Sequence, residues 1–169
     1  MRVAVLTISD RSYHGERADK TGPAVAEAAC RLLPGASVVE QTILPDERDD
    51  IEWNLKRIAD TASADLVLTA GGTGLSPRDV TPQATQAIAG YDVPGIGELM
   101  RAATRAALPV AILSRQVAAV RERTLIVNLP GSPRGAVECL EAVADVLPHA
   151  VATLRNEAGD EHPARLERA

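Results

Sequence analysis

Residues 66–82 read LVLTAGGTGLSPRDVTP, and this stretch decides the fold. It begins with a short apolar run of β-type residues, continues through a loop with three glycines, and ends in a Thr-Pro pair that suits the first turn of a helix. Glycines can adopt positive φ and turn backbone N–H groups toward one point, which is how loops bind phosphate oxygens. The stretch therefore predicts a strand, an anion-binding loop and a helix start.

Asp79 is the one residue of this loop whose charge does not suit an anion site. A carboxylate beside an anion site repels the ligand unless a divalent cation lies between them, so the loop indicates Mg²⁺ bound together with a phosphate ester. The simpler interpretation is a tight strand-to-helix turn in which Asp79 only caps the helix. The two interpretations are compatible.

Two common glycine-loop motifs do not fit the chain. A dinucleotide-binding G-x-G-x-x-G that starts at Gly72 would need a third glycine where the sequence has Pro77, and no G-x-x-x-x-G-K-[ST] occurs. These mismatches argue against a nicotinamide-dependent oxidoreductase and against a P-loop NTPase.

A second carboxylate lies at a similar junction. Residues 36–44 predict a strand, and Pro45, Asp46 and Glu47 predict the start of a helix that extends to about residue 60. If this strand is parallel to residues 66–70, both strands end at the same edge of the sheet, where Asp46 and Asp79 can converge on one cation. The alternative is that Asp46 only interacts with the positive end of the helix dipole.

The rest of the chain alternates strand and helix patterns. Further strands are predicted at residues 2–8, 116–120 and 124–129, and further helices at residues 21–33, 82–89 and 98–107. A long helix is predicted from residue 134, broken near Pro148 and followed by a last helical stretch to about residue 155. Residues 90–97, rich in Gly and Pro, predict a flexible loop at the site. We expect an α/β single-domain three-layer sandwich: a mostly parallel sheet with one antiparallel strand, and helices on both faces. The domain should span residues 1–156, and residues 157–169 should form a polar C-terminal tail.

Residues 128–133, NLPGSP, repeat the design of strand, tight loop and capped helix. Ser132 as N-cap and Pro133 as the first helical residue would present the free N–H groups of a helix N-terminus. This loop is therefore a second candidate anion site.

Composition narrows the class of protein. The net charge of −5 argues against a nucleic-acid surface, and 2% aromatic residues argue against single-strand stacking platforms. There is no secretory signal and no apolar run of about 18 residues, so we expect no membrane association and a cytoplasmic location. Cys30 and Cys139 are expected to fill the core, and Trp53 to lie in the core or at an interface.

The motifs above together resemble the signature of the MogA/MoaB family of molybdenum-cofactor biosynthesis proteins. That pattern is an apolar strand, Gly-Gly-Thr-Gly, an apolar residue, a short spacer and Arg-Asp-Val-Thr-Pro, which residues 66–82 match. The resemblance continues through residues 9–11 (SDR), 20–23 (KTGP), 114–117 (SRQV) and 129–133 (LPGSP), and covers most of the chain. One departure is Ala118, where related sequences often have Gly; it affects strand packing more than catalysis.

The resemblance implies Mg²⁺-dependent adenylylation of molybdopterin by ATP, with release of pyrophosphate. An Asp of the Pro-Asp-Glu segment and the Asp of Arg-Asp-Val-Thr-Pro are tied to catalysis in the family, and they match Asp46 and Asp79. We therefore expect these two carboxylates to be catalytic and to hold Mg²⁺. The expected substrate-binding residues are Ser9, Asp10, Gly71, Gly72, Thr73, Gly74, Ser76, Thr81, Glu98, Ser114, Arg115, Pro130, Gly131 and Ser132.

Several alternatives stay open at the level of sequence. Which loop binds the adenylyl group and which the pterin phosphate is not decided, and Glu98 is either part of the pterin side or an acidic first-turn residue. The resemblance also implies a homotrimer and a downstream partner that inserts molybdenum. The rival function is a molybdopterin-binding carrier or scaffold without turnover. Loss of one carboxylate would mark such a carrier, and both Asp46 and Asp79 are present.

Overall fold

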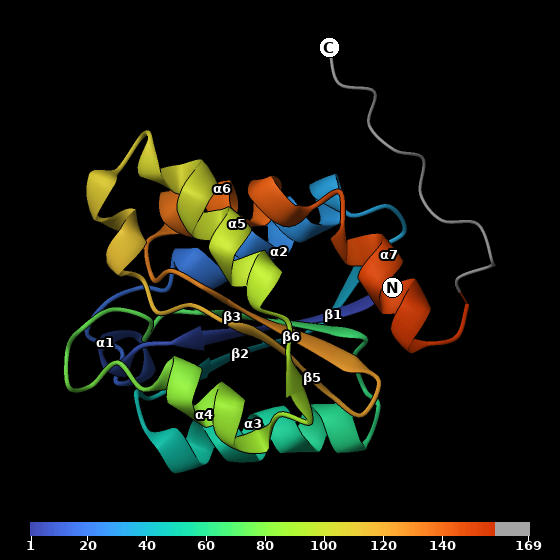
Figure 1. The fold of residues 1–169 in the computed structure, drawn as a ribbon. Helices are drawn as coiled ribbons and strands as arrows, with labels where there is room; N and C mark the ends of the chain where they lie inside the picture. Colours follow the sequence, from blue (N-terminus) through green and yellow to red (C-terminus); the bar gives the residue numbers. More distant parts are fainter. Residues whose placement is uncertain (158–169) are drawn as a thin grey trace.

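The computed structural model describes residues 1–157 of the 169-residue chain. Figure 1 shows one twisted sheet between two layers of helices. Apart from Glu157, the expected polar tail at residues 157–169 lies outside the described residues. Among residues 1–157, no helix is long and apolar enough to cross a membrane.

Within the described residues six strands form a single sheet with the order β2-β1-β3-β6-β5-β4. Strands β2, β1, β3 and β6 are parallel to one another, whereas β5 is antiparallel to both β6 and β4. The bounds are β1 Arg2–Ile8, β2 Ser37–Leu44, β3 Leu66–Ala70, β4 Tyr91–Asp92, β5 Ala118–Arg121 and β6 Thr124–Leu129. The expected mostly parallel sheet with one antiparallel strand is confirmed.

Helices cover both faces of the sheet, as the sequence predicted (Figure 1). Helices α2, α5, α6 and α7 pack on one face, and α3 and α4 on the other. The bounds are α1 Asp10–Tyr13, α2 Thr21–Leu32, α3 Arg48–Asp60, α4 Thr81–Ile88, α5 Pro94–Arg105, the 3-10 helix η1 Pro109–Leu113, α6 Pro133–Val143 and α7 Leu147–Leu154.

The core has two parts because the parallel strands are buried on both faces. In β1, Val3 and Val5 pack toward α2 and α6, while Ala4 and Leu6 pack toward α3. Full burial of an aliphatic side chain such as Leu6 contributes about 2 kcal/mol. Ala118 is fully buried in β5, so this strand accommodates alanine at that position. The two-sided core fixes the register of the strands and brings their carboxyl ends to one edge of the sheet.

The predicted flexible loop at residues 90–97 is wrong. Tyr91 and Asp92 form β4, which pairs with β5, and Gly90 N–H and Val93 N–H donate to carbonyls of that strand. Pro94 then begins α5 instead of preventing it, since proline is well tolerated in a first helical turn. Glu98 consequently lies beyond the first turn of α5, so its interpretation as a first-turn acid is also wrong.

Helix α3 begins slightly later than the sequence predicts, and α2 begins where predicted, with a hydrogen-bonding side chain just before it. Helix α3 begins at Arg48, so Asp46 precedes the helix. Thr21 is the first residue of α2, and the side chain at the start of this helix that accepts hydrogen bonds belongs to Asp19, whose donors are the N–H groups of Thr21 and Gly22.

One of the two cysteines expected in the core is exposed, and Trp53 lies outside the core, which leaves its expected position at an interface untested. Cys139 is buried as expected, but Cys30 is exposed. Trp53 is 63% exposed, with the guanidinium of Arg57 over its ring, because α3 turns this residue away from the sheet.

Candidate active site

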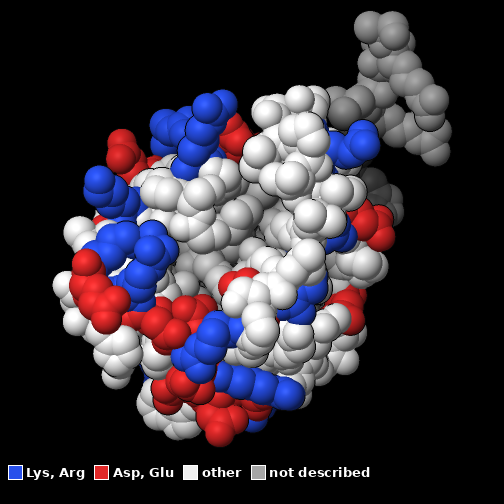
Figure 2. Space-filling model, turned by 90° about the vertical axis from the view of Figure 1, so that its left-hand side faces the viewer, with Lys and Arg blue, Asp and Glu red and all other residues white. Residues whose placement is uncertain are grey.

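A cavity of about 390 Å³ lies at the carboxyl ends of the parallel strands. Figure 2 views this end of the molecule and shows a hollow whose rim has clusters of acidic and basic side chains. The lining residues come from the ends of β1 and β3, from the segments that follow β1, β2, β3 and β6, and from the start of α2: Thr7, Ile8, Ser9, Asp10, Arg11, Arg17, Thr21, Asp46, Ala70, Gly71, Gly72, Asp79 and Gly131. This is the sheet edge at which open α/β sheets bind ligands.

The glycine loop after β3 needs glycine for close packing. Gly71 has φ +121°, and a Cβ there would lie 2.1 Å from the carbonyl oxygen of Ile8. Gly72 has φ +61°, and a Cβ there would lie 2.3 Å from Thr81 Oγ1, which is buried without a hydrogen-bond partner among residues 1–157. The loop can therefore lie against the end of β1 and the start of α4 only because both residues lack side chains.

The loop leaves some of its backbone donors available. Gly71 N–H donates to the carbonyl of Leu129 at 3.1 Å, so this donor belongs to the sheet. The N–H groups of Gly72, Thr73 and Gly74 have no backbone acceptor within the described part of the chain. Gly72 lines the cavity, Thr73 and Gly74 follow it in the same loop, and free N–H groups of this kind suit an anionic ligand.

Asp46 and Asp79 both line the cavity, and each has one carboxylate oxygen engaged by the backbone. Asp46 Oδ2 accepts a hydrogen bond from Asp10 N–H at 2.9 Å, and Asp79 Oδ2 accepts one from Ser76 N–H at 2.9 Å. The other oxygen of each has no hydrogen-bond donor among residues 1–157. Neither carboxylate caps the helix that follows it, because α3 and α4 have no side-chain cap. The capping interpretation of Asp79 is thus wrong, whereas the interaction of Asp46 with the dipole of α3 stays an alternative.

The carboxylates influence one another. Burial raises the pKa of Asp46, and the nearby carboxylates of Asp10 and Asp79 raise it further, against the opposing effect of the hydrogen bond from Asp10 N–H. The pKa of Asp10 is lowered, first by the hydrogen bond it accepts from Asp46 N–H and then by the Arg78 guanidinium. Mutual repulsion between Asp46 and Asp79 is the electrostatic condition that a shared cation relieves.

The donor set fits Mg²⁺ held jointly with a ligand. Among residues 1–157, no three His, Cys, Asp or Glu side chains are arranged to hold a metal ion by themselves. Mg²⁺ commonly binds one or two carboxylates and completes its shell with phosphate oxygens and water. The free oxygens of Asp46 and Asp79, next to the N–H groups of the glycine loop, match that pattern.

The second predicted loop adjoins the first. Ser132 Oγ accepts from Gly135 N–H at 3.2 Å with Pro133 at the start of α6, so the predicted N-cap is confirmed. Thr21 Oγ1 donates to the carbonyl of Gly131 at 2.9 Å, which ties this loop to α2. A second cavity of about 360 Å³ borders on the first and shares three of its lining residues: Arg17, Thr21 and Gly131.

The structure sorts the other predicted binding residues into three groups. Ser9, Asp10, Gly71, Gly72 and Gly131 line the main cavity, and Ser132 lines the adjoining one. Another group belongs to the surrounding loops without lining either cavity: Thr73, Gly74, Ser76, Thr81, Ser114, Arg115 and Pro130. Glu98 is exposed on α5 and lines neither cavity, because α5 begins earlier than expected.

The sequence analysis did not identify three arginines of the site, two in the cavity lining and one at the rim. Arg11 and Arg17 line the main cavity, and Arg78 binds Asp10 and Glu47 at its rim. Arg11 and Arg78 each lie within a quoted motif, SDR and RDVTP, and could have been found there. Arg17 lies in an irregular polar segment, where no spacing signal marks it.

The fold and the cavity are those of an α/β domain suited to a phosphate-bearing ligand. This chain belongs to the family described as "Probable molybdopterin binding domain", whose sequence profile matches residues 4–149. The chain is 43% identical to a molybdopterin adenylyltransferase of Helicobacter pylori over 151 residues, which are 89% of this chain and 86% of that protein. It is 45% identical to the Escherichia coli K12 molybdopterin adenylyltransferase over 145 residues, which are 86% of this chain and 74% of that protein.

A solved structure gives the same family. The molybdopterin biosynthesis enzyme MoaB from Thermus thermophilus superimposes with a TM-score of 0.84 and 48% sequence identity, covering 92% of this chain and 96% of that one. The resemblance seen in the sequence motifs is thereby confirmed.

Proposed function

We propose that this protein is a molybdopterin adenylyltransferase that acts in the biosynthesis of the molybdenum cofactor. Two relatives with this activity in their names, at 43% and 45% identity, support the proposal. The observation within the chain that supports it best is the pair Asp46 and Asp79, each with one free oxygen at the same cavity beside a glycine loop.

The reaction joins two phosphate esters. An oxygen of the terminal phosphate of molybdopterin attacks the α-phosphorus of ATP, a new P–O bond forms, and the bond to the β-phosphate breaks to release pyrophosphate. The protein has little covalent work to do, because such transfers are catalysed mainly by positioning and by neutralising charge.

The roles of the residues follow from their positions. Asp46 and Asp79 would hold Mg²⁺ with their free oxygens, and a cation bound there would supply neutralising charge to the phosphate oxygens. The N–H groups of Gly72, Thr73 and Gly74 donate to phosphate, and the start of α6 at Ser132 and Pro133 binds a second phosphate group. Arg11 and Arg17 add positive charge at a cavity that otherwise presents three carboxylates: Asp10, Asp46 and Asp79.

The decisive experiment mixes the protein with molybdopterin, ATP and Mg²⁺ and measures adenylylated molybdopterin and pyrophosphate. We expect both products in equal amounts, and none when ATP or Mg²⁺ is omitted. Binding of molybdopterin without product under these conditions would contradict the enzyme and favour the carrier alternative.

The proposal also covers the oligomeric state of the protein, its downstream partner and its cellular location. An interface between chains is supported by η1, which buries no residue of its own and exposes more than half of Val110, Ile112 and Leu113. Contiguous exposed apolar surface of this kind commonly marks an interface. The number of three chains follows the family resemblance. The product then passes to a partner that inserts molybdenum, and both proteins work in the cytoplasm.

A further inference from the structure

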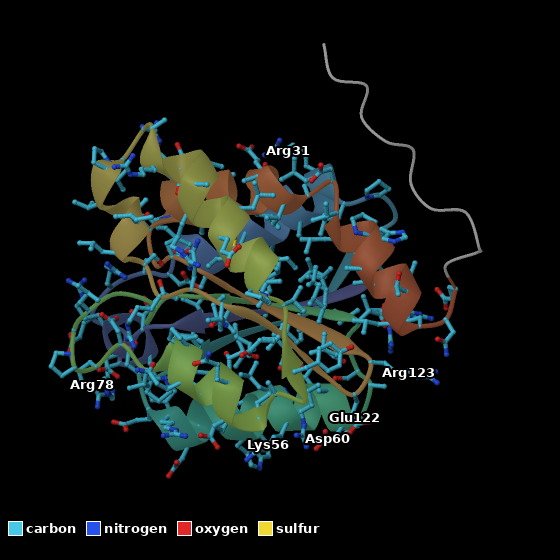
Figure 3. The ribbon with its side chains drawn as sticks, viewed as in Figure 1. Arg31, Lys56, Asp60, Arg78, Glu122 and Arg123 are labelled. Atoms are coloured by element: carbon cyan, nitrogen blue, oxygen red, sulfur yellow. The ribbon has the colours of Figure 1, made fainter. Side chains whose placement is uncertain are left out.

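Asp79 is next to Arg78 in sequence and is contacted by Arg115, and the guanidinium groups of both arginines donate hydrogen bonds to other groups of the protein. Arg78, its neighbour in sequence, donates to both carboxylate oxygens of Asp10 at 2.9 to 3.1 Å and to Glu47 Oε1 at 2.8 Å. These partners lie 68 and 31 residues away in the chain, at the ends of β1 and β2. Figure 3 shows Arg78 at the end of the molecule where these strands finish.

Arg115 holds the other side of the same loop. Its Nε donates to the carbonyl of Gly74 at 2.7 Å, and its Nη2 donates to the carbonyl of Asp79. Its backbone N–H donates to the carbonyl of Thr73 at 2.8 Å. The guanidinium of Arg115 is therefore occupied by backbone oxygens and does not line either cavity.

These contacts connect the two carboxylates through the protein. Asp10 and Asp46 each accept the backbone N–H of the other at 2.9 Å, so the segment of Asp46 is tied to Asp10. Arg78 extends this connection from Asp10 to the residue before Asp79. A bidentate guanidinium fixes direction as well as distance, which a lysine ammonium does not.

The connection is needed because like charges face one another. Asp46 and Asp79 line the same cavity, and repulsion between two carboxylates favours movement of the loop away from β2. Residues 71–80 form no helix or strand that would resist such movement. Exposed ion pairs add little to global stability, so the ion pairs of Arg78 suit local placement of the loop better than support of the fold.

We propose that Arg78 and Arg115 are positioning residues that hold Asp79 opposite Asp46, at the separation at which one Mg²⁺ can bind both carboxylates. This inference rests on the proposed function for the identity of the metal and the nucleotide. It assigns neither arginine to the substrate, in contrast to the role expected of Arg115 from the sequence.

The first test measures the loop without metal or nucleotide. We expect Arg78→Ala to speed amide hydrogen exchange at Ser76 and Asp79 by about tenfold or more, because local opening of the loop becomes easier, with the rest of the protein unchanged. Arg31→Ala is the matched control. Arg31 is 57% exposed against 53% for Arg78, and it also pairs between elements, with Glu141, but in the helical layer away from the cavity (Figure 3).

The second test separates positioning from direct contact with phosphate. ATP affinity is measured with and without Mg²⁺ in the wild type, Arg78→Ala and Arg78→Lys. Positioning predicts that Arg78→Ala loses most of the gain in affinity that Mg²⁺ gives, while affinity without Mg²⁺ stays within about twofold. Arg78→Lys should behave like Arg78→Ala, because it keeps the charge but not the bidentate geometry.

The outcomes are distinct. An equal loss of ATP affinity with and without Mg²⁺ would make Arg78 a direct ligand and overturn the proposal, as would wild-type exchange at Ser76 and Asp79. If Arg78→Ala does not fold, Glu47→Gln and Arg115→Lys weaken the same connection one contact at a time and should show smaller effects in the same direction. If the wild type binds Mg-ATP but forms no adenylylated pterin, the proposed function fails while the exchange result still decides the positioning role.

Discussion

At the scale of single residues, the site depends on the different roles of the two oxygens in each carboxylate. One oxygen of Asp46 and one of Asp79 accept backbone N–H groups, which fixes the side chains, and the second oxygen of each stays free beside the glycine loop. The sequence predicted both residues and their convergence. It could not exclude helix capping, because an Asp just before a helix looks the same in sequence whether it caps that helix or accepts a backbone N–H from another segment or from its own loop.

The raised pKa of Asp46 leads to a prediction about stability. Burial and neighbouring carboxylates raise this pKa above the ordinary value of 3.8, so ionised Asp46 disfavours the folded state above its folded pKa. That cost disappears as pH falls through the folded pKa toward the unfolded value. Without Mg²⁺, Asp46→Asn should therefore be more stable than the wild type at about pH 7 and lose this advantage by about pH 4.

Chemical denaturation midpoints at the two pH values measure the effect. Asp49→Asn is the control, because it removes an acidic residue from the first turn of α3 and should lower stability instead. A wild type more stable than Asp46→Asn at neutral pH would show that the Asp46 carboxylate is stabilised, not strained, in the folded protein.

At the scale of elements, the unit of β3, glycine loop and α4 was predicted well because its signals are local. An apolar run favours a strand, glycines permit positive φ, and a Thr-Pro pair suits a helix start, each at its own position in the sequence. Strand β4 was missed for the opposite reason. Its two residues have no strand signal of their own, and the strand exists because Gly90 N–H and Val93 N–H find acceptors in β5. Pairing between distant segments is not visible in a local pattern.

Gly71 provides the test at this scale. Alanine there would adopt φ +121° and place its Cβ 2.1 Å from the carbonyl oxygen of Ile8, so Gly71→Ala should destabilise the protein by about 3 kcal/mol or more. Gly15→Ala is the matched control. Gly15 also has positive φ, +74°, but no atom lies within 4 Å of its Cβ position, so the cost should be only about 1–2 kcal/mol.

Denaturant unfolding of the two variants measures the difference. Equal losses for Gly71→Ala and Gly15→Ala would mean that the close approach of the loop to β1 does not exist in solution.

At the scale of the whole molecule, the three-layer α/β architecture was predictable because strands and helices alternate along the chain. The strand order β2-β1-β3-β6-β5-β4 was not, since order and register depend on contacts between segments far apart in sequence. Assembly is harder still to read from sequence, because apolar residues such as Ile112 give the same pattern in a core and at an interface.

The proposed homotrimer gives a prediction for this scale. Ile112 in η1 is 51% exposed in the single chain, and an aspartate there would be buried unpaired if η1 forms the interface. Ile112→Asp should therefore shift the mass measured by light scattering from three chains toward one, with the circular dichroism spectrum retained. Val39→Asp, at a similarly exposed position in β2, should leave the mass unchanged. A wild-type protein that already elutes as a single chain would contradict the trimer.

The central claim is that Asp46 and Asp79 share one Mg²⁺, and a double-mutant cycle tests it most directly. The rate of adenylylated molybdopterin formation is measured at saturating Mg²⁺ for Asp46→Asn, Asp79→Asn and the pair, with thermal melts alongside. Each single variant should lose at least about 100-fold in rate with little change in melting temperature, because each removes a group that stabilises charge in the reaction and not the core. The double variant should be barely slower than the slower single variant, because either substitution already breaks the shared site. Losses that add in the logarithm of the rate, or a fully active Asp46→Asn, would contradict the shared metal site.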